Sequence, residues 1–174
     1  LQNDRGLQND RGLQNDRGLQ NDRGFLDDTV AAIASRVRSR QQSAREVTQL
    51  ALDRIEALNP SINAFVAYDG ERALAQADAI DRRLAAGEDV GPLAGVPVGV
   101  KDLEAVEGFV TSFGSDLHVE DAPAAADSVH VGRYRAAGAI IVGKTNTPEY
   151  GHKGATDNVP FGPTLNPLSL DHSP

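Results

Sequence analysis

The sequence contains no cysteine, which excludes disulfide bonds and thiolate metal sites. It also contains no tryptophan, and aromatic residues make up only 5% of the chain, so we expect a core built mainly from Ala, Val, Leu and Ile. Apolar runs long enough to cross a membrane are missing, and so is anything that resembles a signal peptide. These absences predict a cytoplasmic protein that does not bind a membrane.

Positive charge is also scarce. The chain has 17 Lys and Arg against 25 Asp and Glu, for a net charge of −8, and its basic residues form no cluster. Nucleic acid binding depends on such clusters to neutralise phosphates, so it is not expected here. The histidines lie at positions 118, 130, 152 and 172 without the spacing of a metal site, and we predict neither a metal nor a cofactor.

Residues 1–24 consist of the hexapeptide LQNDRG repeated four times. This polar, turn-prone composition predicts a disordered extension. A left-handed β-helix would need more coils, and leucines six residues apart do not line one face of a helix. Each unit carries one Asp and one Arg, so the net negative charge lies entirely in residues 25–174, which we take as the folded part.

The first half of this folded part has the pattern of helices. Apolar residues at helical spacing predict a helix over residues 29–40. Ser43 and Glu46 form the S-x-x-E capping box, which starts a second helix that Asn59-Pro60 is expected to end. A short strand is predicted within residues 62–68, and an Ala-rich helix over residues 71–86, with Gly87 as its C-terminal cap.

The second half changes to a strand–helix–strand pattern. Residues 91–100 predict a turn that leads into an apolar strand covered on both faces. A helix over residues 127–137, ended by Gly138, and a buried strand over residues 139–142 follow. This order is typical of a right-handed crossover in a mostly parallel sheet, so we predict an α/β fold. Residues 158–174 are expected to form an ordered loop or extended chain.

Lys101 is the first candidate for a catalytic residue. The chain has only three lysines, and this one ends an apolar strand, where its stem is expected to be partly buried. Burial disfavours the charged form of a lysine and lowers its pKa, which can turn the amine into a general base near neutral pH. The alternative is a strand-end lysine that reaches solvent or pairs with Asp102 or Glu104.

Residues 138–145, GAIIVGKT, match the P-loop pattern G-x-x-x-x-G-K-[ST]. A P-loop needs a flexible loop followed directly by a helix. Here the variable positions are Ala-Ile-Ile-Val, which favour a strand. We therefore expect Lys144 to be a strand-end lysine that faces a polar partner, and nucleotide binding remains a remote alternative.

Ser112 and Ser115 are the serines that could pair with a lysine as a nucleophile. They flank a glycine, in a context typical of turns, so loop hydroxyls are the favoured interpretation. The carboxylates lie at helical surface spacing and predict a solvated face.

Taken together, several segments resemble the amidase signature family. They are SAREV at 43–47, IEALNP at 55–60, GPLAGVPVGVKD at 91–102, AAGAIIVGKTN at 136–146, TDN at 156–158 and FGPTLNP at 161–167. The resemblance extends over residues 27–174 in order, and corresponds to roughly the first third of a typical family domain. The LQNDRG repeats lie outside it.

The resemblance implies hydrolysis of an amide C–N bond by a Ser–cis-Ser–Lys triad, with Lys101 at the lysine position. The lysine, neutral when active, draws a proton through a bridging serine; the second serine attacks the carbonyl, and backbone N–H groups hold the oxyanion. The bridging serine of the family lies in a Gly-Gly-Ser-Ser-Gly-Gly stretch, expected directly after a segment like residues 171–174. Ser169 and Ser173 precede that motif and take neither role.

The 174 residues therefore carry the family's lysine without its serines. We expect a truncated amidase fragment, inactive by itself, that would act on a small-molecule amide once completed by the C-terminal part. A non-catalytic amidase-like fragment or interaction protein is the alternative. Because part of a parallel sheet leaves apolar surface uncovered, we also expect marginal stability or aggregation. The sequence sets neither the substrate nor the oligomeric state.

Overall fold

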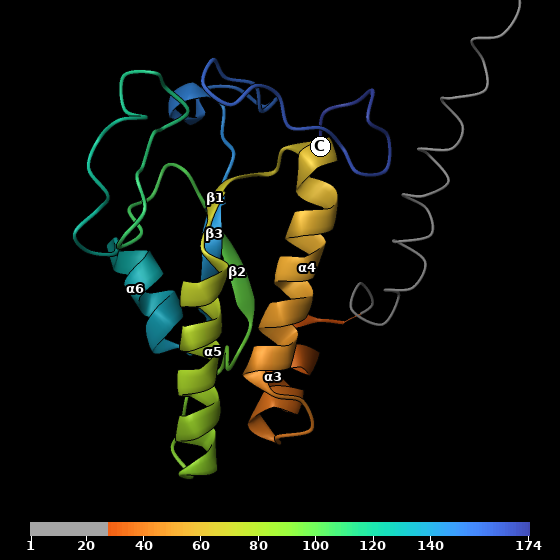
Figure 1. The fold of residues 1–174 in the computed structure, drawn as a ribbon, viewed down its shortest axis with the longest axis vertical. Coiled ribbons are helices and arrows are strands. Elements are labelled where there is room, and N and C mark those ends of the chain that lie inside the picture. Colours follow the sequence, from red (N-terminus) through yellow and green to blue (C-terminus); the bar gives the residue numbers. More distant parts are fainter. Residues whose placement is uncertain (1–27) are drawn as a thin grey trace, which may run out of the picture.

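The computed structural model of the chain describes residues 28–174 (Figure 1). The predictions for the repeats at residues 1–24 lie outside this range. The described elements are α3 (Val30–Arg38), α4 (Ala44–Ile62), β1 (Phe65–Tyr68), α5 (Gly70–Ala85), β2 (Pro97–Lys101), α6 (Val129–Ala136), β3 (Ile140–Thr145) and the short 3-10 helix η1 (Glu149–Gly151).

Helices α3 and α4 both begin at a residue whose side chain caps the first turn. The Thr29 hydroxyl accepts a hydrogen bond from the Ala32 amide at 3.1 Å at the start of α3. At the start of α4, the Ser43 hydroxyl accepts from the Glu46 amide at 3.0 Å, and the Glu46 carboxylate accepts from the Ser43 amide at 2.9 Å. The capping box is confirmed, and it satisfies two backbone donors that the first turn leaves open.

The predicted end of this helix at Asn59-Pro60 is wrong. Pro60 lies inside α4, which continues to Ile62 and is capped by Asn63 in the left-handed conformation, with φ of 50°. Pro60 removes a single N–H from the last turn, and the Asn63 amide still donates to Asn59 O at 2.8 Å. The Asn59 side chain also bonds to both backbone groups of Phe65, at 2.9 and 2.7 Å, which joins α4 to β1.

The sheet has three strands in the order β1-β3-β2 within the described residues (Figure 1). Strands β2 and β3 pair in parallel, as the strand–helix–strand pattern predicts, while β1 pairs with β3 in the antiparallel direction. The fold is therefore α/β with a small mixed sheet.

Strand β3 is covered on both faces. Ile140 and Val142 belong to the larger apolar cluster, which includes Val37 of α3, Val47 of α4 and Ala77 of α5. Ile141 points to the opposite face, where a second cluster joins it to Val131 of α6 together with Val100, Val106 and Phe109. This alternation follows from the period of two along a strand.

Strand β2 is less buried than predicted. Only Val100 of its five residues is buried, and Lys101 is exposed. The sequence prediction of a strand covered on both faces is wrong for β2, because Gly99 and Lys101 are exposed on either side of the buried Val100.

Gly138 closes the helix α6 and lies against the turn that precedes β2. Its φ is +90°, and an added Cβ would lie 2.2 Å from Val90 O. A glycine is required here both by the left-handed backbone and by this close approach. The Gly95 amide donates to Gly138 O at 2.9 Å, so the starts of β2 and β3 are joined at this point.

The chain after η1 contains no helix or regular strand, as predicted, and passes over the end of the sheet where β2 and β3 finish (Figure 1). Asn146, directly after β3, anchors it: the Asn146 amide nitrogen donates to Gly162 O at 3.1 Å and to the Thr164 hydroxyl at 3.0 Å. The tail is therefore tied to the carboxyl end of the central strand.

Candidate active site

Lys101 ends β2 at the carboxyl edge of the sheet, opposite Thr145, its register partner at the end of β3. The carboxyl ends of parallel strands are the usual place for a site in α/β folds. Lys101 was expected to be partly buried, but in the structure it is exposed.

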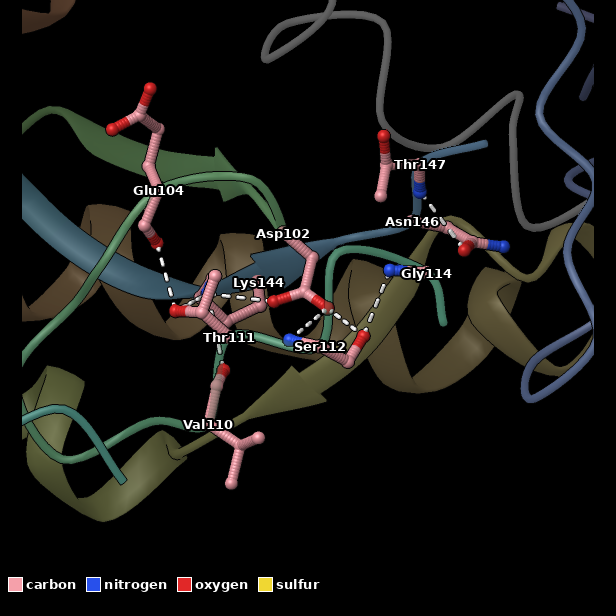
Figure 2. A network of polar contacts seen from close by, with 9 residues as sticks. All are labelled: Asp102, Glu104, Val110, Thr111, Ser112, Gly114, Lys144, Asn146 and Thr147. Atoms are coloured by element: carbon pink, nitrogen blue, oxygen red, sulfur yellow. Dashed lines mark hydrogen bonds and ion pairs between the residues drawn. The ribbon is translucent and has the colours of Figure 1, made fainter. Parts of the chain in front are cut away.

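Asp102, the next residue, is buried, with only 2% of its surface exposed. Its amide donates to Thr145 O at 2.9 Å, and its carbonyl accepts from the Phe113 amide at 3.1 Å. Its carboxylate accepts from the Ser112 amide at 3.2 Å and from the Ser112 hydroxyl in a shorter contact (Figure 2). The backbone directly after Lys101 is thus tied both to β3 and to the loop that returns at residues 110–114.

Lys144 supplies the positive charge that opposes Asp102. The Lys144 side chain is fully buried, and its Nζ lies 2.7 Å from Asp102 Oδ1. The same nitrogen donates to the Thr111 hydroxyl at 2.9 Å and to Val110 O at 3.1 Å (Figure 2). The prediction that Lys144 is a strand-end lysine facing a polar partner is confirmed.

The protonation of Lys144 follows from two opposed effects. Burial lowers the pKa of Lys144 below its ordinary value, while the carboxylates of Asp102 and Glu104 act in the opposite direction. An ammonium has three N–H donors, and three oxygens surround this one. Each N–H donor of a Lys144 ammonium therefore has an oxygen partner. Because the side chain is fully buried, it cannot contact a substrate.

The P-loop match at residues 138–145 does not form a phosphate-binding loop. Residues Ile140–Thr145 are the central strand β3, so their backbone groups pair with β1 and β2. A P-loop instead directs free amides towards phosphates at the start of a helix. The geometry therefore gives no support to nucleotide binding.

Ser112 and Ser115 are both buried, each 2% exposed. The Ser112 hydroxyl donates to Asp102 and accepts from the Gly114 amide at 3.1 Å, and the Ser115 amide closes a turn on Ser112 O at 3.0 Å. The interpretation of these serines as turn and loop residues is supported. The Ser112 side chain holds Asp102 in place.

Sequence reasoning missed the network as a whole. The sequence pointed to Lys101 and Lys144 as separate candidates, but it did not predict that Asp102 forms its ion pair with Lys144 and not with Lys101. The available signal was the alternation that ends at Lys101: Val100 faces the core, so Lys101 faces the other side, and Asp102 follows it directly. The contribution of Val110 and Thr111 depends on a loop whose path has no pattern in the sequence.

An apolar groove of about 270 Å³ lies between α4 and the open side of the sheet. Its lining includes Ile55, Leu58 and Ile62 of α4 and Pro97 and Gly99 of β2.

Within residues 28–174, no cluster of three or more His, Asp or Glu side chains could hold a metal ion. None of the helices in the same range is both long and apolar enough to cross a bilayer.

Comparison with known proteins identifies the family. The amidase family model matches residues 46–174. An acylamidase from Rhodococcus erythropolis is 45% identical over 141 residues, which cover 81% of this chain and 29% of that protein. One component of the glutamyl-tRNA(Gln) amidotransferase from Acidothermus cellulolyticus is 43% identical over 146 residues, which cover 84% of this chain and 29% of that component.

Solved structures give the same result. A bacterial aryl acylamidase of the amidase signature family superposes with a TM-score of 0.78 at 38% identity, over 84% of this chain and 30% of that one. The peptide amidase from Stenotrophomonas maltophilia superposes with a TM-score of 0.76 at 31% identity, over 86% of this chain and 32% of that one. The fold is thus part of the amidase signature fold.

The chain belongs to the amidase family. It spans 29% of the length of the two curated relatives described above.

Proposed function

We propose that this chain is the lysine-bearing part of an amidase that hydrolyses the C–N bond of small amides, with Lys101 as its proton-transfer residue. The place of Lys101 in the fold supports this proposal: it lies at the carboxyl end of a strand, beside a backbone held by the buried Asp102. Lys144, the other lysine at this edge, is enclosed by three oxygens and has no access to a substrate.

The chemistry assigned to Lys101 is general acid–base catalysis. A neutral amine at this position would take a proton, through a bridging serine, from the serine that attacks the carbonyl carbon. It would then return the proton to the leaving nitrogen as the C–N bond breaks.

The 174 residues do not contain the Gly-Gly-Ser-Ser-Gly-Gly sequence that carries the bridging serine in the family. We therefore propose that this polypeptide alone does not hydrolyse amides, since loss of a triad nucleophile costs several orders of magnitude in rate. Turnover of simple amides by the purified polypeptide, abolished by Lys101→Ala, would contradict this. Translation of the DNA beyond codon 174 is the direct search for the missing motif.

A chimera tests the role of Lys101. Residues 28–174 replace the matching segment of the Rhodococcus erythropolis acylamidase, which is 45% identical to this chain, and hydrolysis is followed with an amide that the parent enzyme accepts. We expect an active chimera in which Lys101→Ala lowers kcat by about 10²- to 10⁴-fold, as for the loss of a general acid–base group. Lys153→Ala, at an exposed lysine, is the matched control.

Full activity of the Lys101→Ala chimera, with the Lys153→Ala chimera also active, would disprove the assignment of Lys101. The substrate class proposed is that of the family, a small amide. The glutamyl-tRNA(Gln) amidotransferase relatives are subunits by name, which suggests further protein chains as partners.

A further inference from the structure

We propose that Asp102 and Lys144 form a positioning pair that fixes the end of β2 and so directs the Lys101 side chain to the face of the sheet opposite Val100. This inference rests on the proposed function, in which Lys101 is the catalytic lysine. It adds Asp102 and Lys144 as residues that act through Lys101. The geometry of the pair itself is independent of that role.

The argument begins with alternation along the strand. Val100 is 5% exposed and Asp102 is 2% exposed, whereas Lys101 between them is exposed. Successive side chains of an extended segment point to opposite faces. Inward placement of both neighbours therefore forces the Lys101 side chain outwards. An apolar cluster holds Val100, but a carboxylate at position 102 needs a specific reason to be buried.

Lys144 provides that reason. A buried carboxylate is costly unless it is paired and hydrogen-bonded, and Lys144 Nζ approaches Asp102 Oδ1 to 2.7 Å. The Ser112 amide and hydroxyl satisfy the second carboxylate oxygen. Without the positive charge, the carboxylate would be more stable in water than inside, and residue 102 would tend to turn outwards.

The pair also joins three parts of the chain at this edge. Lys144 belongs to β3, and its ammonium donates to Val110 O and to the Thr111 hydroxyl of the loop that follows β2. The Thr111 hydroxyl donates in turn to Glu104 O at 3.3 Å (Figure 2). One buried charge thus holds the central strand, the end of the edge strand and the returning loop in fixed relation around the backbone of Lys101.

Nuclear magnetic resonance of the 174-residue chain tests this inference, because its three lysines give separable side-chain signals. The variants are Lys144→Met and the nearly isosteric Asp102→Asn; Lys153→Met is the control, because Lys153 forms only an exposed pair with Asp157 at 3.7 Å. The measurements are the Lys101 Cε and backbone signals and the exchange rates of the Asp102 and Phe113 amides.

We expect both pair variants to shift the Lys101 signals and to accelerate exchange at the Asp102 and Phe113 amides by about tenfold or more, as for loss of a hydrogen bond to a charged group. The Ile140 amide, which donates to Val96 O at the far end of the same strands, should be accelerated by a smaller factor, because a general loss of stability affects all amides alike. The Lys153→Met chain should match the wild type throughout.

Unchanged Lys101 signals in both pair variants would overturn the inference. So would acceleration of the Ile140 amide by the same factor, because that result indicates only a general loss of stability. If neither variant folds, the wild type decides: slowly exchanging ammonium protons on Lys144 support the pair, and a neutral Lys144 amine at pH 7 overturns it. None of these readouts uses amide hydrolysis, so an inactive or Lys101-independent chimera would count against the proposed function alone.

Discussion

Lys144 and Asp102 form an ion pair of 2.7 Å in which both side chains are buried, at 0% and 2% exposure. Two opposite charges in such a setting repay their loss of hydration only through good geometry and further hydrogen bonds. Here Thr111, Val110 and Ser112 supply those bonds. The pair should therefore matter more to stability when one partner is removed than when both are.

Removal of one partner, by Lys144→Met, leaves the Asp102 carboxylate buried without its charge partner. We expect this change to lower the free energy of unfolding by about 3–5 kcal/mol, whereas Lys144→Met combined with Asp102→Asn should cost less because no charge stays buried. Urea unfolding followed by circular dichroism measures both. Equal costs for the single and double variants would show that the charges are not coupled.

The exposed pair Lys153–Asp157 gives the baseline for this measurement. Its atoms are 3.7 Å apart, and its side chains are 42% and 61% exposed. Exposed pairs contribute about 0–1 kcal/mol, so Lys153→Met should leave the urea midpoint nearly unchanged.

Two glycines around α6 predict substitutions of opposite sign. Gly138 has a φ of +90° and a Cβ there would meet Val90 O at 2.2 Å, whereas Gly132 lies inside α6 with nothing within 4 Å. We expect Gly138→Ala to destabilise the chain by more than about 1 kcal/mol and Gly132→Ala to stabilise it by about 0.5–1 kcal/mol. Thermal unfolding of the two variants in parallel tests the contrast, which a shift in the same direction for both would refute.

The capping box of α4 should make its first turn sensitive to acid. Hydrogen bonds from the Ser43 backbone and hydroxyl hold the pKa of Glu46 below its ordinary value of 4.5. A carboxylate with a lowered pKa stabilises the folded state above its unfolded pKa, and that contribution is lost as the pH falls through the folded pKa. The loss is therefore expected below pH 4.5.

Glu46→Gln removes this titration while it keeps a side-chain acceptor for the Ser43 amide. The wild type should lose stability more steeply than Glu46→Gln below pH 4.5, and the two should run parallel above about pH 6. Ser43→Ala should cost about 1 kcal/mol at pH 7. Urea unfolding at a series of pH values gives the free energy of unfolding of both chains. If it falls equally steeply below pH 4.5 in the wild type and in Glu46→Gln, the pKa of Glu46 is the same in the folded and unfolded states.

Much of the fold follows from local signals in the sequence. Apolar spacing predicts α3, the Ser43 capping box predicts the start of α4, and Gly138 marks the end of α6. These signals are reliable because a helix cap or a positive φ restricts the residue type at only one or two positions, independently of distant parts of the chain. The strand β3 was also predicted, because its apolar run is covered on both faces.

The failures concern features that depend on distant residues. Pro60 was expected to end α4, but the αL cap at Asn63 and the bonds from Asn59 to Phe65 keep the helix to Ile62. Lys101 was expected to be partly buried, but it is exposed, because coverage of a strand's face depends on which elements pack against it. Neighbours of a strand are set by tertiary packing, and no pattern within residues 91–102 reports them.

The tail over the carboxyl edge of the sheet depends on the amide of Asn146, which is 5% exposed. The Asn146 Nδ2 donates to Gly162 O and to the Thr164 hydroxyl, and its Oδ1 accepts from Asn158 Nδ2 at 2.6 Å. Asn146→Asp has the same shape but replaces the donor by an oxygen, which would face the acceptor at Gly162. We expect a cost of about 1–3 kcal/mol and release of the tail.

Hydrogen exchange at the Leu165 amide, which donates to Ile62 O at 2.9 Å, measures that release directly. Asn166→Asp is the matched control, because Asn166 acts through its Oδ1, which accepts from the Leu168 amide at 2.9 Å, and a carboxylate can do the same. Faster exchange at Leu165 in Asn146→Asp but not in Asn166→Asp would confirm that the donor of Asn146 holds the tail. Equal protection in both variants would place the anchor elsewhere, in the bond between the Thr164 hydroxyl and Asn63 O at 2.7 Å.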